Sequence, residues 1–120
     1  MAKRSAKGIS RLYQAFGWTM SGLKATFVHE EAFRQELLLC VVLAPLSFYF
    51  GKTGVERSLL LGSLLLILIV ELLNSAVEAT VDRISMEDHD LAARAKDMGS
   101  AAVFLSLVNA GVIWLLVILT

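Results

Sequence analysis

Long apolar runs constrain this chain more than any other feature. Residues 101–119 form a run of 19 residues with only three small or polar interruptions, and a second run covers about residues 55–70. A third run, at residues 37–50, has 14 residues. A helix needs roughly 20 apolar residues to cross a bilayer. The sequence therefore predicts three membrane helices, at about residues 32–50, 55–82 and 91–119.

The composition supports a membrane protein. Of the 120 residues, 57% are hydrophobic and 18% are charged, whereas soluble domains are nearer half apolar and a quarter charged. The length predicts a single membrane domain over residues 1–120. The formal net charge is zero, so no overall positive field would attract nucleic acid. The one cysteine, Cys40, excludes an intramolecular disulfide and makes a cysteine-based metal site improbable.

The first membrane helix is the shortest. It reaches spanning length only if Ala32 and Phe33 belong to it, with Arg34 and Glu36 extending to the interface or facing protein. Pro45 lies within it and is tolerated where neighbouring helices satisfy the freed carbonyl.

An amphipathic helix is predicted before the spans, at about residues 5–28. Apolar residues recur there at steps of three and four, and we expect the helix to be broken or softened near Gly17. Basic residues accompany them, so we expect this helix to lie in the headgroup plane; the alternative is a soluble core helix. The apolar positions are Ile9, Leu12, Tyr13, Phe16, Met20, Leu23 and Phe27.

The distribution of Lys and Arg predicts the orientation. Nine of these residues lie before the first span or between the second and third, and two, Lys52 and Arg57, lie between the first and second. Cytoplasmic loops carry the excess of positive charge. The N-terminus and the link between the second and third spans are therefore predicted to be cytoplasmic.

Polar residues form a stripe where the second span ends. At about 100° per residue, Glu71, Asn74, Glu78 and Asp82 share a sector about 80° wide, with Ser75 beside it. Ionisable residues in a membrane helix are costly and indicate function by default. The alternative is that these carboxylates only hold helices together by pairing with Arg34, Lys96 or a neighbouring subunit.

The chemistry of the stripe suits a hard cation. Carboxylate and amide oxygens without cysteine favour Mg²⁺, which usually takes one or two protein carboxylates and completes its shell with water and phosphate. Arg94 and Lys96 lie just before the third span and could meet such phosphates, with Asp97 and Ser100 as polar neighbours.

Three motifs together resemble one family. The segments ELLNSAVEATVDRI (71–84) and RAKDMGSAAV (94–103) closely resemble the prokaryotic integral-membrane diacylglycerol kinases, and HEEAFRQE (29–36) looks like the acidic segment of that family. The resemblance covers most of the chain from about Arg11. It implies a homotrimeric bundle in the bacterial inner membrane. It also implies transfer of the ATP γ-phosphoryl group to diacylglycerol, giving phosphatidic acid, at sites between subunits.

The resemblance also implies roles for individual residues. Glu71 would be the general base, Glu30 and Glu78 the Mg²⁺ ligands, and Asn74 and Asp82 would support them. The implied nucleotide contacts are Arg11, Trp18, Glu30, Glu78, Glu87, Asp88, His89, Lys96 and Asp97. The implied lipid contacts are Ala32, Phe33, Arg34, Gln35, Glu36, Arg57, Glu71, Ser100 and Trp114.

Three positions depart from the pattern of the family. Trp18 stands where we expect tyrosine, His29 where asparagine is common, and Asp88 where an aromatic residue is frequent. Stacking or polarity is preserved at Trp18 and His29, so these two departures affect only the details of nucleotide contact.

Two other functions compete with diacylglycerol phosphorylation. Undecaprenol kinases are similar bacterial enzymes, and periodicity cannot distinguish an acyl from a prenyl substrate. A small oligomeric cation channel or proton-coupled carrier would also place carboxylates in the membrane. However, it predicts polar residues along all three spans, and here they cluster at one end.

Overall fold

The computed structural model describes residues 7–84 and 89–120, and these residues form four α-helices and no β-strand. The helices are α1 (Gly8–His29), α2 (Glu31–Phe50), α3 (Gly54–Ile84) and α4 (Asp90–Leu119). By length and composition, α2, α3 and α4 can each cross a membrane. The predicted all-α fold with three membrane helices and one further N-terminal helix is confirmed.

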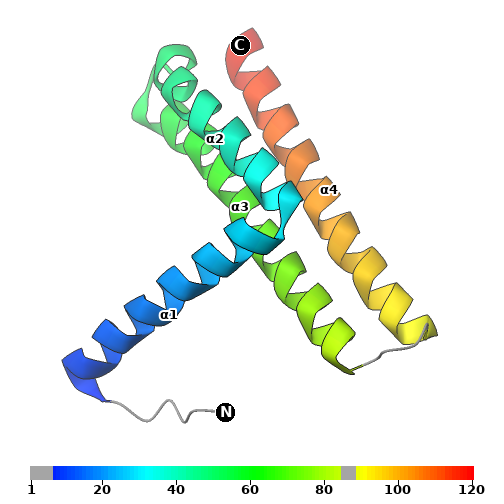
Figure 1. Cartoon of the computed structure of the whole chain (residues 1–120). Coiled ribbons are helices and arrows are strands. Elements are labelled where there is room, and N and C mark those ends of the chain that lie inside the picture. Colours follow the sequence, from blue (N-terminus) through cyan, green and yellow to red (C-terminus); the bar gives the residue numbers. More distant parts are fainter. Residues whose placement is uncertain (1–6, 85–88) are drawn as a thin grey trace.

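The α3 helix lies at the centre of the arrangement. It packs against both α2 and α4, and Figure 1 shows these three helices side by side, with α1 leaving the bundle at a steep angle. The α2 helix continues through Pro45 without interruption.

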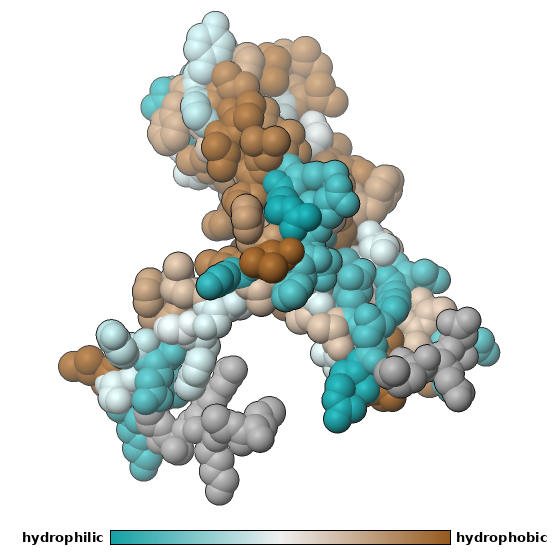
Figure 2. Space-filling view, viewed as in Figure 1, coloured by the Kyte–Doolittle hydropathy of each residue, from teal (hydrophilic) through white to brown (hydrophobic). Residues whose placement is uncertain are grey.

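The core of a single chain is small. The buried apolar residues come from α2, α3 and α4 and are Phe33, Cys40, Leu60, Leu64, Ile67 and Ala110. Many large apolar side chains, such as Val41, Leu65 and Phe104, are more than half exposed. Figure 2 shows this apolar surface in brown over the upper part of the molecule. Contiguous exposed apolar surface of this kind indicates contact with lipid or with other protein chains.

The α1 helix makes few contacts with the rest of the chain. None of its residues is buried, and Ile9 is 85% exposed. The predicted break near Gly17 is wrong, because α1 runs unbroken from Gly8 to His29. A glycine in the interior of a helix lowers helix stability by only about 1 kcal/mol relative to alanine. The helical turns on either side of Gly17 offset this loss. The position of α1 in the headgroup plane stays a prediction.

A tight turn joins α2 to α3. The Thr53 hydroxyl accepts a hydrogen bond from the Glu56 backbone N–H (3.1 Å), and the Glu56 carboxylate accepts one from the Lys52 N–H (2.8 Å). Arg57 Nε donates to the Gly51 carbonyl at 2.9 Å. A Cβ on Gly51 would lie 2.6 Å from Arg57 Cγ, so glycine is required for this close approach. The turn makes α2 and α3 antiparallel neighbours.

The lengths of the helices differ in a way that places the polar stripe. The 20 residues of α2 span roughly 30 Å, which is about the thickness of the bilayer's hydrocarbon core, whereas the 31 residues of α3 span roughly 46 Å. The turn joins the end of α2 to the start of α3, and the two helices run side by side from there. Because α3 is longer, it extends beyond the point where α1 joins α2 (Figure 1). The end of α3 therefore lies at and beyond the level of that junction.

Candidate active site

The junction of α1 and α2 is built around Glu30. This residue lies between the two helices, as the C-cap of α1 and the N-cap of α2, and its backbone is extended (φ −116°, ψ 108°). Its N–H donates to the Thr26 carbonyl at 2.8 Å. Arg34 Nη1 donates to the carbonyls of Phe27 (2.7 Å) and Val28 (3.1 Å), which would otherwise lack partners at the helix end. The guanidinium thus fixes the angle between the helices and the position of Glu30.

The polar stripe on α3 changes in burial along its length. Glu71 is only 4% exposed and Ser75 is buried, Asn74 and Glu78 are half-buried, and Asp82 is exposed. The stripe therefore leads from a buried position at Glu71 to an exposed one at Asp82.

Carboxylates from three parts of the chain gather at Glu71. It interacts electrostatically with Glu78 on its own helix, with Glu30 at the junction and with Glu36 on α2. Like charges this close repel each other. The concentration of negative charge favours binding of a cation or of a positively charged group.

A cavity of about 450 Å³ opens between α1 and α3 beside this cluster. Glu30, Thr26 and His29 line it from one side, and Ser75 lines it from α3. The other lining residues are small or apolar: Gly22, Ala25, Leu72, Ala76 and Ala79. Glu30 therefore lies at the level of the stretch between Glu71 and Glu78.

Two buried oxygens of the site have no hydrogen-bond partner among the described residues. They are Glu36 Oε2 and Asn74 Oδ1. Each such atom costs about 1–3 kcal/mol. Unpaired polar atoms of this kind require an explanation, such as a catalytic role or an ion that binds beside them.

The α4 helix brings a cation to the same face of α3. Lys96 Nζ lies 2.6 Å from Asp82 Oδ1, with the two side chains 44% and 64% exposed. Asp97 and Ser100 lie on the same stretch of α4 and are exposed. Lys96 thus lies at the outer end of the stripe and is paired with an acid of that stripe. Such a pairing is the alternative to a functional role that the sequence leaves open, and the role of Lys96 toward phosphate stays a prediction.

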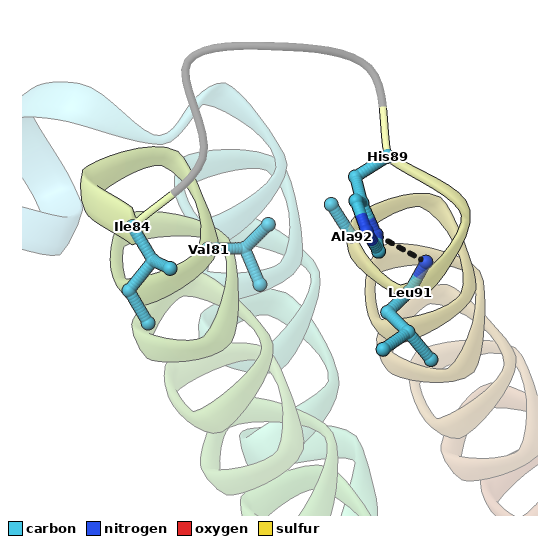
Figure 3. Close-up of a pocket in the computed structure, with 5 residues that line it drawn as sticks. All are labelled: Val81, Ile84, His89, Leu91 and Ala92. Carbon is cyan, nitrogen blue, oxygen red and sulfur yellow. Dashed lines mark hydrogen bonds between the residues drawn. The ribbon is translucent and has the colours of Figure 1, made fainter.

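A second cavity, of about 420 Å³, lies between the end of α3 and the start of α4. Figure 3 shows its lining, in which the Val81 side chain points across toward α4. His89 is the N-cap of α4, and its Nδ1 accepts a hydrogen bond from the Leu91 N–H at 3.1 Å. Glu87 and Asp88, which the sequence also implies as nucleotide contacts, lie outside the described residues.

The donor set fits a magnesium ion held with substrate. Within residues 7–84 and 89–120, no three His, Cys, Asp or Glu side chains are grouped so as to hold a metal ion. Glu30 and Glu78 supply two carboxylates near Glu71. Mg²⁺ characteristically takes one or two carboxylates and leaves its other positions to water and phosphate.

Several residues implied as contacts are far from Glu71 within one chain. Arg11 lies 18 residues before His29 on a straight helix, which is about 27 Å, and the half-buried Trp18 lies between them. Arg57 is held in the α2–α3 turn, at the opposite end of α3. Trp114 is near that end too, where its Nε1 donates to Ser63 Oγ at 3.1 Å.

The implied lipid contacts at the start of α2 have different environments. Phe33 is buried, Glu36 is half-buried, and Ala32 and Gln35 are exposed. Sequence reasoning missed that Arg34 caps α1, and it also missed the Ser63–Trp114 hydrogen bond. No local pattern indicates either, because both join different helices.

The amino-acid sequence is similar to those of known proteins over almost its whole length. The sequence profile of the prokaryotic diacylglycerol kinases matches residues 17–118. A diacylglycerol kinase of Pseudomonas aeruginosa is 50% identical over 112 residues, covering 93% of this chain and 91% of that protein. One from Haemophilus influenzae is 47% identical over 107 residues, covering 89% and 91%, respectively. One from Escherichia coli is 43% identical over 107 residues, covering 89% and 88%.

These matches extend over nearly the whole chain, from the middle of α1 to the end of α4. They include the three membrane helices together with the acidic residues gathered at the α1–α2 junction. This multi-pass membrane protein belongs to the prokaryotic diacylglycerol kinase family.

Proposed function

We propose that this chain transfers the γ-phosphoryl group of ATP to the free hydroxyl of diacylglycerol, forming phosphatidic acid and ADP. Membership of the family and the names of its relatives support the lipid substrate. The structural observation that carries the proposal is the buried Glu71, close to Glu30 and Glu78 at the level where α1 meets α2.

The burial of Glu71 near the α1–α2 junction supports a substrate hydroxyl at the membrane interface. Diacylglycerol is insoluble, and its hydroxyl lies at the headgroup level, so the acceptor of its proton must lie at that depth. The junction of α1 and α2 marks that level if α1 lies on the membrane surface. Glu71 is then reached from the lipid side, whereas Asp82 and Lys96 lie toward the cytoplasm.

The reaction needs a base and positive charge. The Glu71 carboxylate takes the hydroxyl proton while the hydroxyl oxygen bonds to the γ-phosphorus, and the bond from that phosphorus to the β–γ bridging oxygen breaks to release ADP. Glu30 and Glu78 would hold Mg²⁺, which neutralises phosphate charge when bound. Lys96 would offset charge on the transferring group. Positioning and electrostatics supply most of the rate in phosphoryl transfer.

We also propose an assembly of three chains in the inner membrane, as the resemblance to the family implies. Arg11 and Trp18 are remote from Glu71 in one chain, and α1 projects from the bundle (Figure 1). A neighbouring copy would supply them to the acidic cluster. The exposed apolar surfaces of α2, α3 and α4 would then face either lipid or another copy.

One assay separates the two lipid substrates. The purified protein in mixed micelles with Mg-ATP is offered diacylglycerol and undecaprenol separately, and the phosphorylated lipid is identified. We expect phosphatidic acid. Phosphate on undecaprenol alone would assign the chain to the other lipid, and no transfer to either would reject a lipid kinase.

A further inference from the structure

One glycine of α4 lies unusually close to the polar stripe of α3. A Cβ added to Gly99 would overlap Asn74 Oδ1 and would lie 3.2 Å from Asn74 Cγ. By contrast, a Cβ added to Gly111 on the same helix, or to Gly62 on α3, would meet nothing within 4 Å. Gly99 is therefore in direct contact with the asparagine amide, and the other two glycines are not in contact with a side chain.

The amide of Asn74 connects Gly99 to Glu78. Asn74 Nδ2 donates to Glu78 Oε1 at 3.4 Å, one helical turn further along α3. Its Oδ1 is buried and has no hydrogen-bond partner within residues 7–84 and 89–120. A carboxylate accepts only, so the amide must turn its nitrogen toward Glu78 and its oxygen toward Gly99. The hydrogen bond is long, and packing against α4 helps to hold the amide in this orientation.

We propose that Gly99 is a positioning residue for the metal–nucleotide site, acting through Asn74 on Glu78. This inference rests on the proposed function, in which Glu78 holds Mg²⁺. The Gly99 hydrogen that stands in place of a side chain leaves room for the amide oxygen. The amide nitrogen then restrains the Glu78 carboxylate in the orientation that the structure shows.

A side chain at residue 99 has a defined consequence. It displaces the Asn74 amide, the hydrogen bond to Glu78 is lost, and the carboxylate is free to rotate away. Loss of a residue that orients a metal ligand typically weakens metal binding by 10- to 100-fold. A glycine that serves only close packing of α3 and α4 acts differently, because its effect does not depend on the Asn74 amide.

A double-mutant cycle separates these two roles. The variants are Gly99→Ala, Asn74→Ala and the two combined, in the purified full-length protein. Mn²⁺ affinity in the presence of a non-hydrolysable ATP analogue is measured by electron paramagnetic resonance, together with the Mg²⁺ dependence of transfer. Gly111→Ala is the matched control, since it adds the same methyl group to the same helix in open space.

We expect Gly99→Ala and Asn74→Ala each to weaken Mn²⁺ binding by about 10-fold, and the double variant to bind as Asn74→Ala does. Gly111→Ala should bind as the wild type. The proposal would be overturned if the double variant bound Mn²⁺ more weakly than Asn74→Ala by the same factor that Gly99→Ala alone causes. Wild-type Mn²⁺ affinity in Gly99→Ala would overturn it as well.

If Gly99→Ala does not fold, Asn74→Leu replaces it, because leucine keeps the volume of the asparagine without its amide. Wild-type Mn²⁺ affinity in Asn74→Leu would overturn the proposal, and a loss of about 10-fold would support the step from Asn74 to Glu78 on which it depends. Mn²⁺ binding without transfer to either lipid would reject the kinase proposal and still decide the role of Gly99.

Discussion

Lys96 Nζ lies 2.6 Å from Asp82 Oδ1, so an ion pair joins α4 to the outer end of the polar stripe on α3. Both side chains are substantially exposed, and exposed pairs contribute only about 0–1 kcal/mol to stability. The pair therefore does little to hold the helices together. Its main effect is to keep a cation on the acidic face of α3.

Replacing Lys96 should affect nucleotide use more than stability. In Lys96→Met we expect a KM for Mg-ATP at least about 10-fold higher, because a charge-assisted hydrogen bond to phosphate contributes about 1.5–3 kcal/mol. Steady-state kinetics at saturating diacylglycerol measure it. Asp82→Asn is the control, since it breaks the ion pair and leaves the lysine charge; its KM should change less than that of Lys96→Met. An unchanged ATP dependence in Lys96→Met would remove the residue from the nucleotide site.

Neutralising either proposed metal ligand should raise the Mg²⁺ requirement. Removing one carboxylate of a two-carboxylate site leaves water to replace it, so we expect Glu30→Gln and Glu78→Gln to need about 10-fold more Mg²⁺ for half-maximal rate. Glu31→Gln, an exposed neighbour of Glu30, should behave as the wild type. Equal Mg²⁺ requirements in all four proteins would show that these carboxylates do not bind the metal.

The cap on α1 gives a structural prediction. Arg34→Ala removes two hydrogen bonds to the last turn of α1, so that turn should open more easily by about 1 kcal/mol, or about fivefold in amide hydrogen exchange. Exchange measured by mass spectrometry over residues 26–31 tests this. The adjacent Gln35→Ala serves as the control. Identical exchange in Arg34→Ala and the wild type would mean that the guanidinium does not fix the junction.

The far end of the bundle can be tested separately. Ser63→Ala removes the acceptor of the Trp114 Nε1 hydrogen bond, and its loss should lower the free energy of unfolding by about 1 kcal/mol. Denaturation followed by Trp fluorescence measures it. Trp114→Phe should lower the free energy of unfolding by a similar amount through loss of the same hydrogen bond. The double variant should lower it by less than the sum of the two single effects. Full additivity would indicate that the bond contributes nothing.

The sequence predicted the helices well because each carries its own signal. The apolar run at residues 101–119 has spanning length by itself, and the residues of the stripe, from Glu71 to Asp82, share a face by helical periodicity alone. The sequence failed at Gly17, where a local propensity was overestimated in a helix that continues on both sides.

Contacts between helices could not be predicted in the same way. The carbonyls that Arg34 caps belong to α1, and the partner of Gly99 is on α3, 25 residues earlier in the sequence. Such pairs depend on the angle and register of packed helices, which periodicity does not determine. The roles of Glu30, Glu71 and Glu78 came from resemblance to the family, and they stay predictions.

Glu71→Gln is the most direct test of the account. The substitution keeps the size and polarity of the side chain and removes its ability to take a proton. General-base catalysis typically contributes 10²- to 10⁴-fold, so kcat for phosphatidic acid formation should fall by about that factor while Mn²⁺ and nucleotide still bind. A purified Glu71→Gln protein that turns over diacylglycerol as fast as the wild type would contradict the account.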